Sequence, residues 1–413
     1  MWRKPARALR GPLLVVSILA VAALFGARPI LGAPQAAKPG AAAGIPPVES
    51  LQLQHTTVFS VPAPLGYSSG IRCDSHGHIY LLPATFAGVP LRLQPFSSVS
   101  ELIPDEKRTV TYRALPLSGS RYPHAAMLSF AVLPDGRLYA LIFTRRISSK
   151  GKPLSGPEYY VERFNDDGTR DAIIHVDTPP GVAHWYASLL APFSGGRLLI
   201  AGTRTNIEKR PGAGSWRPFT AIYDSSGSFV SEVTLPHDIA NNFDEGGAGK
   251  PGAAGKAKGR ASPTQASKSG RYFDVGITTG GAVSGPYGNV WILRNSDPIR
   301  LYAVSPSGQV TQHFEFSPPV RGLVPFDFGF ASPQEIFFEF ARPPAPPGAP
   351  SSGPSELVGV LDTTLQRFEA LYTVSLKNSK GFGSLACSDG NGGFLYLGST
   401  RDNRLAVFDY ALR

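Results

Sequence analysis

Residues 128–143, LSFAVLPDGRLYALIF, contain the pattern that decides the fold. An apolar segment runs into a Pro-Asp-Gly turn, and a second segment with Tyr, Ile and Phe follows at once. Asp and Gly favour such a turn because Asp hydrogen-bonds the nearby backbone and Gly adopts positive φ without strain. Aromatic and β-branched residues favour strands on both sides of it. The stretch therefore predicts a β-hairpin.

The same hairpin recurs six times along the chain. The strands that follow the turns are GHIYLLPA from 77, GRLYALIF from 136, GRLLIAG from 196, GNVWILR from 288, QEIFFEF from 334 and GGFLYLGS from 392. A third apolar segment and often a second turn come next, as in YYVERFNDDGT from 159; in the first repeat PLRLQPFSS from 90 takes this place. Each repeat thus predicts a four-stranded antiparallel sheet. Such a sheet cannot bury both faces alone, so we predict an all-β, six-bladed β-propeller.

The two ends of the predicted propeller complement each other. The sixth repeat stops after its third strand, at residues 405–413. Residues 51–62, LQLQHTTVFSVP, alternate as a strand does but precede the first repeat. We therefore expect this N-terminal strand to supply the missing outer strand of the last blade, which would close the ring and remove an exposed edge.

The blade turns D-x-x-G-x-[IL]-Y and F-x-x-x-G resemble those of six-bladed propellers of the NHL and SMP-30/gluconolactonase-like (TolB-like) class, over residues 51–413. The resemblance implies the architecture. It does not indicate a function, because lactonases, sugar dehydrogenases, lyases and binding modules share this scaffold. Residues 64–72 contain no carboxylate, although the lactonase-like relatives place a Glu at the mouth of the first blade. This difference argues against hydrolase activity.

The N-terminus has the features of an export signal. Basic residues precede the apolar run LLVVSILAVAALFGA at 13–27, which is short for a membrane span. Residues 1–33 are therefore predicted to be a signal peptide, with an uncleaved N-terminal anchor as the alternative. Residues 34–50 are rich in Pro, Ala and Gly and predict a tether, and residues 51–413 the propeller. The expected location is periplasmic or extracellular.

The formal charge of +10 does not predict a nucleic-acid partner. Residues 1–40 hold six basic residues and no acid, and residues 246–270 hold five and no acid, so the rest of the chain is close to neutral. Residues 246–270 are rich in Gly, Ala, Ser and Lys and predict a disordered low-complexity insertion.

The two cysteines, Cys73 and Cys387, occupy equivalent places in the first and last repeats. Those blades are neighbours if the ring closes, and an exported protein meets an oxidising compartment. A disulfide between them is one expectation, and two buried thiols are the other.

We expect a ligand at the channel mouth, on the loops that enter each innermost strand. The candidates there are Tyr67, Tyr122, His124, His184, Trp185, Tyr272, Asp274, Asp327 and Phe382. Aromatic side chains with a few polar groups suit a sugar, peptide or aromatic ligand. The alternative is that these aromatics fill the channel and pack between blades.

Metal binding has little support in the sequence. His124, His184, Asp274 and Asp327 carry suitable ligand atoms for calcium or zinc, but their spacing specifies no site. Asp74, Asp135, Asp166, Asp167 and Asp389 are expected to form turns. No cofactor is predicted.

The expected function is that of a non-catalytic ligand- or protein-binding module of the cell envelope, acting as a monomer on a small molecule or protein. No G-x-S-x-G, H-E-x-x-H, Walker or dinucleotide motif occurs in a fitting context, so the sequence leaves enzymatic activity open. A membrane contact is expected only through an uncleaved N-terminal segment. The alternative function is a metal-assisted hydrolase or lactonase that acts on a small sugar derivative.

Overall fold

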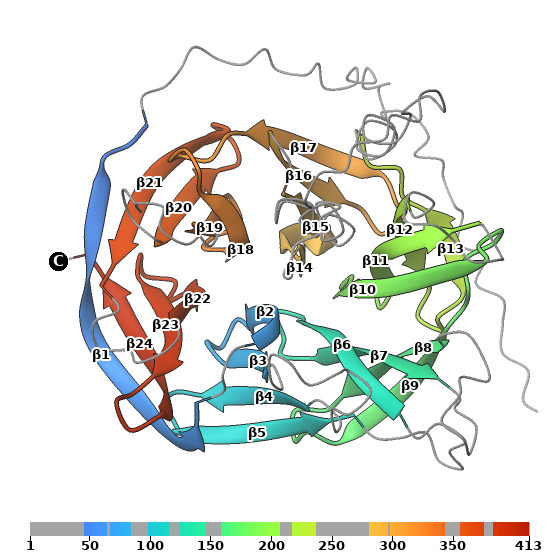
Figure 1. Ribbon diagram of the computed structural model, residues 1–413, viewed down its shortest axis with the longest axis horizontal. Helices are drawn as coiled ribbons and strands as arrows, with labels where there is room; N and C mark the ends of the chain where they lie inside the picture. The colour runs from blue at the N-terminus through green and yellow to red at the C-terminus, as the bar shows by residue number, and fades with distance from the viewer. Residues whose placement is uncertain are drawn as a thin grey trace, which may run out of the picture. The chain divides into compact units, whose positions relative to one another are not determined.

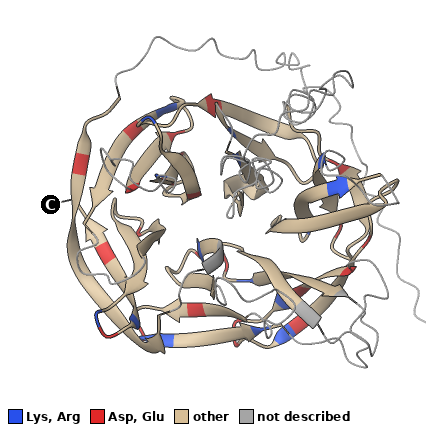
Figure 2. Ribbon diagram, in the orientation of Figure 1, with Lys and Arg blue, Asp and Glu red and all other residues tan. Residues whose placement is uncertain are grey.

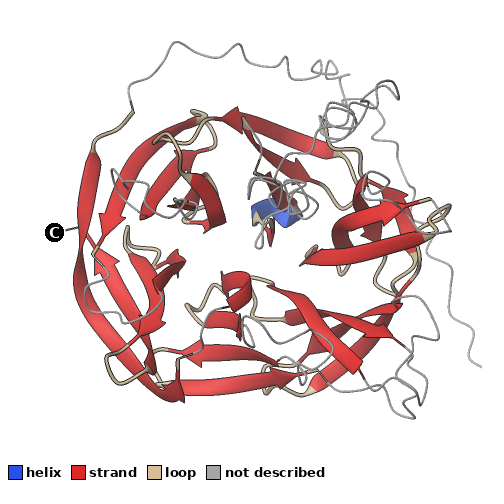
Figure 3. Cartoon of the chain, in the orientation of Figure 1, coloured by secondary structure: helices blue, strands red, loops and turns tan. Residues whose placement is uncertain are grey.

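Short strands joined by tight turns make up the part of the chain that the computed structural model describes (Figure 3). The described residues are 45–63, 67–83, 98–114, 124–145, 158–206, 217–236, 281–295, 298–342, 356–375 and 383–412. Their one helical element is a single 3-10 turn, Pro286–Gly288. Residues 45–413 form one compact unit, and the predicted signal segment and the insertion at 246–270 lie outside the described residues.

Four separate sheets each contain four antiparallel strands in sequence order. The first consists of β2 (Tyr67–Cys73), β3 (Ile79–Pro83), β4 (Ser98–Ile103) and β5 (Arg108–Arg113), and the second of β6 (His124–Val132), β7 (Leu138–Arg145), β8 (Glu158–Phe164) and β9 (Arg170–Val176). The third consists of β10 (His184–Pro192), β11 (Leu198–Thr205), β12 (Arg217–Tyr223) and β13 (Phe229–Glu232), and the fourth of β14 (Ala282–Ser284), β15 (Val290–Arg294), β16 (Ile299–Val304) and β17 (Val310–Phe316).

The remaining eight strands form one sheet. It contains β18 (Val324–Phe330), β19 (Glu335–Ala341), β20 (Glu356–Asp362), β21 (Arg367–Val374), β1 (Val48–Pro62), β24 (Arg404–Ala411), β23 (Phe394–Ser399) and β22 (Gly383–Ser388), in this spatial order. The five sheets are arranged around a common centre, with the first strand of each hairpin repeat innermost, as in a β-propeller (Figure 1).

The N-terminal strand β1 joins the two halves of the eight-stranded sheet. It pairs antiparallel with β24, with Gln52 opposite Ala411 and Val58 opposite Ala406. This is the pairing that the sequence predicted for residues 51–62. The N-terminal end of β1 also pairs in parallel with β21, from Val48 opposite Leu371, which the sequence did not predict. Six separate blades were predicted, and the structure has four separate sheets plus one larger sheet, because β1 forms hydrogen bonds along both edges.

Two further boundaries differ from the prediction. The third strand of the first sheet is β4, Ser98–Ile103, whereas the predicted segment at 90–98 lies, except for Ser98, outside the described residues. The strand β1 begins at Val48, so residues 48–50 belong to the sheet and not to the predicted tether. Around the third strand of the first sheet and the start of β1, the sequence is polar or proline-rich. The limits of these strands are therefore set by hydrogen bonding to strands that are distant in the sequence.

Six clusters of buried apolar side chains hold the sheets together. One lies between the second and third sheets, where Trp185 is only 3% exposed and packs on Tyr159 and Phe219. Another lies inside the eight-stranded sheet, between β19–β20 and β22–β24, and includes Phe337 and Phe394. The two halves of that sheet therefore pack against each other as neighbouring sheets do elsewhere in the ring.

A disulfide joins the first sheet to the eight-stranded sheet. Cys73 at the end of β2 bonds to Cys387 in β22, with their Cα atoms 6.1 Å apart. The structure thus confirms the disulfide and rules out the alternative of two free thiols. Both cysteines belong to the apolar cluster between these sheets, so the bond reinforces the seam where the chain ends meet.

Charged residues of both signs are interspersed on the described strands (Figure 2). This distribution agrees with the near-neutral body that was expected once residues 1–40 and 246–270 are set aside. Among the described residues, no helix is long and apolar enough to span a membrane.

Candidate functional site

Two adjoining cavities open on the face of the ring that carries the β2–β3, β18–β19 and β22–β23 turns, which we call the hairpin face. The first, the seam groove, has a volume of about 400 Å³ and lies between the first sheet and β1, β22–β23 and β24. The second, the channel-mouth cavity, has a volume of about 390 Å³ and lies at the ends of the innermost strands. Both are lined by Asp74, Ser75, Phe330 and Ala331, so they meet along one wall.

The seam groove is acidic and rich in histidine. Its lining includes four aspartates and three of the eight histidines of the chain, and no Lys or Arg: Asp74, Asp105, Asp389, Asp409, His55, His76 and His78. The groove therefore offers acceptors and negative charge, which attract a cation.

Asp74 shapes the wall that the two cavities share. Its Oδ1 accepts hydrogen bonds from the backbone N–H groups of His76 (2.8 Å) and His78 (3.0 Å), which confirms its predicted role as a turn former. Its Oδ2 is left for side chains, and the Tyr80 hydroxyl donates to it at 3.0 Å. One carboxylate thus fixes the turn and also enters a side-chain cluster.

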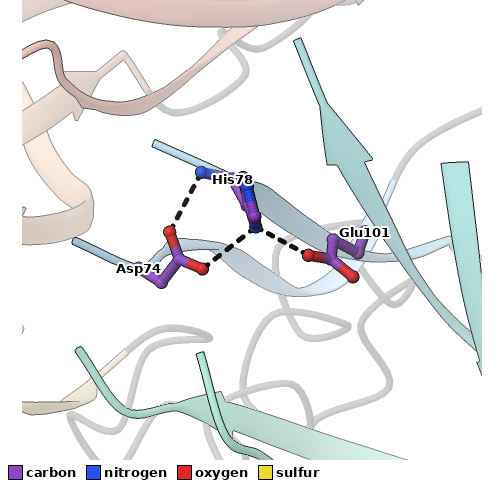
Figure 4. Close-up of side chains that lie close together, drawn as sticks. All are labelled: Asp74, His78 and Glu101. Carbon is purple, nitrogen blue, oxygen red and sulfur yellow. Dashed lines mark hydrogen bonds and ion pairs between the residues drawn. The ribbon is translucent and has the colours of Figure 1, made fainter. Parts of the chain in front are cut away.

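That cluster contains Asp74, His78 and Glu101 (Figure 4). His78 Nδ1 lies 3.3 Å from Asp74 Oδ2 and 2.8 Å from Glu101 Oε1. The Tyr112 hydroxyl donates to Glu101 Oε2 at 2.6 Å, and Tyr80 bridges the two carboxylates. Burial, followed by nearby carboxylates, raises the pKa of Tyr80, and burial also raises that of Tyr112, so both phenols stay protonated donors.

Asp409 and Asp389 form the opposite wall of the groove. Burial raises the pKa of Asp409, the charge of Asp389 raises it further, and His55, its register partner on β1, opposes this. Asp409 Oδ1 is buried and has no hydrogen-bond partner within the described part of the chain. Asp389 Oδ1 accepts hydrogen bonds from the backbone N–H groups of Asn391 and Gly393, so Asp409 is the less compensated of the two carboxylates. A bound cation would favour its charged form.

The channel-mouth cavity is mostly apolar. Its lining includes Val132, Pro134, Pro286, Phe328, Phe330, Pro333 and the Cys73–Cys387 disulfide. Tyr287 follows Pro286 directly, is 81% exposed, and has φ of 61°. A bulky residue in this left-handed conformation is strained, and such strain is common beside ligand sites. An apolar ligand body would fit here.

Two buried polar pairs connect inner strands of the ring, and Arg72 of the first pair also lines the channel-mouth cavity. Arg72 of β2 forms an ion pair with Asp327 of β18 at 3.1 Å, which ties the first sheet to the eight-stranded sheet. Glu339 of β19 accepts hydrogen bonds from Ser384 Oγ (2.7 Å) and from the Leu385 backbone N–H (3.2 Å). Burial raises the pKa of Glu339 to about 8, so it titrates near neutral pH.

The residues predicted for the channel mouth have different outcomes. Trp185 is buried between sheets and Asp327 is paired with Arg72, while His184 is half-buried at the start of β10. The backbones of Tyr67 and His124 lie at the starts of β2 and β6, but their side chains are not among the described ones. Tyr122, Tyr272, Asp274 and Phe382 lie outside the described residues.

The hairpin face was not predicted from the sequence. His76, His78 and Glu101 were not among the predicted candidates. The cluster that the described residues contain includes neither His184 nor Asp327, and Asp274 and the side chain of His124 lie outside the described ones. The available signal was the spacing in DSHGH at 74–78, where two histidines alternate directly after a turn-forming aspartate.

Comparisons with known proteins give only the fold. No family model and no curated protein matches the sequence. Similar solved structures include a protein of unknown function from Dyadobacter fermentans, with 11% identity over 89% of this chain and 100% of that one and a TM-score of 0.46. A Hadza microbial sialidase gives 11% identity over 85% of this chain and 66% of that one, with a TM-score of 0.48.

A Penicillium chrysogenum α-L-arabinanase complexed with arabinobiose gives 10% identity over 86% of this chain and 98% of that one, with a TM-score of 0.43. These propeller proteins include enzymes and proteins of unknown function. Similarity at this level carries no argument about activity.

Proposed function

We propose that this protein is an exported six-bladed propeller that binds a small organic cation on its hairpin face. The cationic group of the ligand would occupy the seam groove, and its apolar body would extend into the channel-mouth cavity. The observation that carries the proposal is the lining of the seam groove, with four aspartates and no Lys or Arg. The adjoining apolar cavity supports the amphipathic character of the ligand.

The blade count is part of this proposal. The six apolar clusters each lie between neighbouring groups of strands, and one of them lies inside the eight-stranded sheet. If β18–β21 count as one blade and β22–β24 with β1 as another, the ring has six blades. The seam groove then lies between the first and last blades, where the two ends of the chain meet.

Export is supported by two features. The basic and apolar pattern at residues 1–27 is typical of a secretory signal, and structural disulfides such as Cys73–Cys387 form and persist mainly in oxidising compartments. A periplasmic or extracellular location would also expose the groove to small cations from the environment. A monomer, with no nucleic-acid partner, remains part of the proposal.

Three six-carbon probes of the same size test the binding proposal: n-hexylamine, n-hexanol and hexanoate, followed by ligand-observed NMR and calorimetry. We expect the amine to bind more tightly than the alcohol by at least about tenfold, which corresponds to about 1.4 kcal/mol. Hexanoate should bind most weakly because the aspartates repel it. Equal affinities for the three probes would contradict a cation site.

A blocking variant locates the binding site. Ser75 is exposed, lies on the wall that both cavities share, and forms part of the Asp-Ser-X-Gly turn at 74–77. Ser225 has the equivalent place in the turn at 224–227 of the third sheet, is also exposed, and lines neither cavity. Ser75→Trp should abolish amine binding and Ser225→Trp should leave it unchanged. Binding that survives Ser75→Trp would place the site elsewhere.

Metal-assisted hydrolysis is the second candidate function, and the Asp74–His78–Glu101 cluster favours it because this cluster lies on the wall of the groove. A metal there could activate water for attack on a ligand carbonyl. Hydrolysis of gluconolactone by the purified protein, lost on chelation and restored by zinc, would support this function. No turnover above the spontaneous rate with zinc present would reject it.

A further inference from the structure

We propose that Asp74, His78 and Glu101 form a binding site for a divalent transition-metal ion of the zinc type. One ligand atom from each residue lies within 4.8 Å of the other two. The ligands around a tetrahedral zinc ion are separated by about 3.3–3.5 Å, so small side-chain movements suffice to bring these atoms around one ion. The inference depends on this geometry and not on the proposed organic ligand.

No Lys or Arg among the described residues forms an ion pair with the two carboxylates of the cluster. The side chains of Asp74 and Glu101 are 1% and 5% exposed. Histidines are the only basic groups that come within 4.0 Å of either carboxylate in the described part of the chain. Two buried carboxylates next to one imidazole leave an excess of negative charge, which is costly unless a cation neutralises it.

The protein also orients these groups from behind. The backbone N–H groups of His76 and His78 hold Asp74 Oδ1, and the Tyr112 hydroxyl holds Glu101 Oε2. The oxygens that face His78 are therefore Asp74 Oδ2 and Glu101 Oε1. Hydrogen bonds of this kind fix ligand orientation in metal sites, and the second-layer donors affect affinity strongly.

Space and access for an ion are also present. Gly136, from the β6–β7 turn of the second sheet, has φ of +85°, and a Cβ there would lie 3.3 Å from Asp74 Oδ2. His78 is 29% exposed and lines the seam groove, so an ion can enter from this side. His76 Nδ1 lies 3.7 Å from Asp74 Oδ2 on a side chain that is 64% exposed, and it can rotate to become a fourth ligand.

The ligand types favour zinc over calcium. Calcium takes six to eight oxygen ligands, whereas one or two imidazoles with two carboxylates are typical of zinc and related ions. The competing explanation is a metal-free network in which the His78 Nδ1–H donates to both carboxylates. The two explanations differ in whether the purified protein binds zinc at one ion per chain.

The test uses the mature protein after removal of any affinity tag and treatment with a chelator. Zn²⁺, Mn²⁺ and Ca²⁺ are titrated separately by calorimetry, and Co²⁺ is added to record its visible absorption. We expect one Zn²⁺ per chain, much weaker Ca²⁺ binding, and the intense Co²⁺ bands of a low-coordinate site. No stoichiometric Zn²⁺ binding by the wild-type protein would overturn the proposal.

Variants assign the ligands. His78→Gln and Glu101→Gln should each lower Zn²⁺ affinity by at least about 100-fold, and Tyr112→Phe by about tenfold because it only loses the orienting hydrogen bond. His175→Gln, an exposed histidine on β9, is the matched control and should not change affinity. Because His78 is partly exposed, its variant should fold even if the Glu101 variant does not. Unchanged affinity in His78→Gln would overturn the assignment.

Discussion

The Cys73–Cys387 disulfide gives a large and measurable prediction, because it closes a loop of 314 residues. In the chain-entropy description, a cross-link stabilises the folded state by restricting the unfolded chain, and a loop of this length corresponds to about 6 kcal/mol at 25 °C. Measured values are usually smaller, about 2–4 kcal/mol. We therefore expect Cys73→Ser with Cys387→Ser to lower the free energy of unfolding by about 3–6 kcal/mol.

The single variants make this test specific. Cys73→Ser alone, Cys387→Ser alone and the double variant all lose the same cross-link, so their losses should be equal within about 1 kcal/mol rather than additive. Urea unfolding followed by tryptophan fluorescence and circular dichroism measures each loss, with wild-type protein under reducing conditions as a further comparison. If the double variant loses less than about 1 kcal/mol, or if the two single losses add, the cross-link is not what stabilises the seam.

Three other predictions concern stability. The pKa of Glu339 is about 8 in the folded protein and near 4.5 when unfolded, so its contribution to stability is greatest below about pH 4.5 and is lost as the pH rises towards 8. The loss is about 1.4 kcal/mol per pH unit and at most about 5 kcal/mol. Glu339→Gln should therefore match wild type near pH 4.5 and exceed its stability at pH 8 in urea titrations, and equal stability at both pH values would contradict this. Tyr287→Asn should raise the free energy of unfolding by about 1 kcal/mol because Asn adopts positive φ with less strain, and a variant that loses stability in urea titrations would contradict this. Trp185→Ala should cost about 3–5 kcal/mol in chemical unfolding because the ring is buried between two sheets, and a change below 1 kcal/mol would return Trp185 to the ligand candidates.

The sequence predicted the fold well where the signal is local. An Asp or Gly turn between two apolar segments identifies a hairpin without further context, and every predicted hairpin is present, for example Leu138–Arg145 after the turn at Gly136. The pairing of residues 51–62 with the last strand could also be predicted, since the last repeat lacked a strand. The parallel contact of β1 with β21 could not, because nothing in either strand encodes a second partner.

The site was harder to predict because strand register creates it. Glu101 lies opposite Tyr80 in the β3–β4 ladder, and this places its carboxylate beside His78. The sequence prediction placed the third strand at 90–98, which did not include Glu101, so its register with Tyr80 could not be derived. Without the correct register, DSHGH at 74–78 contained a turn and two histidines but no converging ligands.

One candidate predicted for the channel mouth has a different role in the structure. Aromatic residues before each innermost strand suggested a mouth on the loop side, but Trp185 is buried between sheets. An aromatic residue that recurs once in every repeat has the same spacing whether it packs between blades or faces a channel. The spacing alone therefore does not separate these two roles. Three acids of the seam groove, Asp74, Asp105 and Asp389, lie at hairpin turns, and the fold brings them around one groove with Asp409 of β24.

A crystal structure of the protein soaked in n-hexylamine tests the proposed binding site most directly. The account predicts density for the probe on the hairpin face, with its amine beside Asp389 and Asp409 and its alkyl chain directed towards Phe330. A well-diffracting crystal with this groove open to solvent, and with the probe absent from it or bound at another face, would contradict the account.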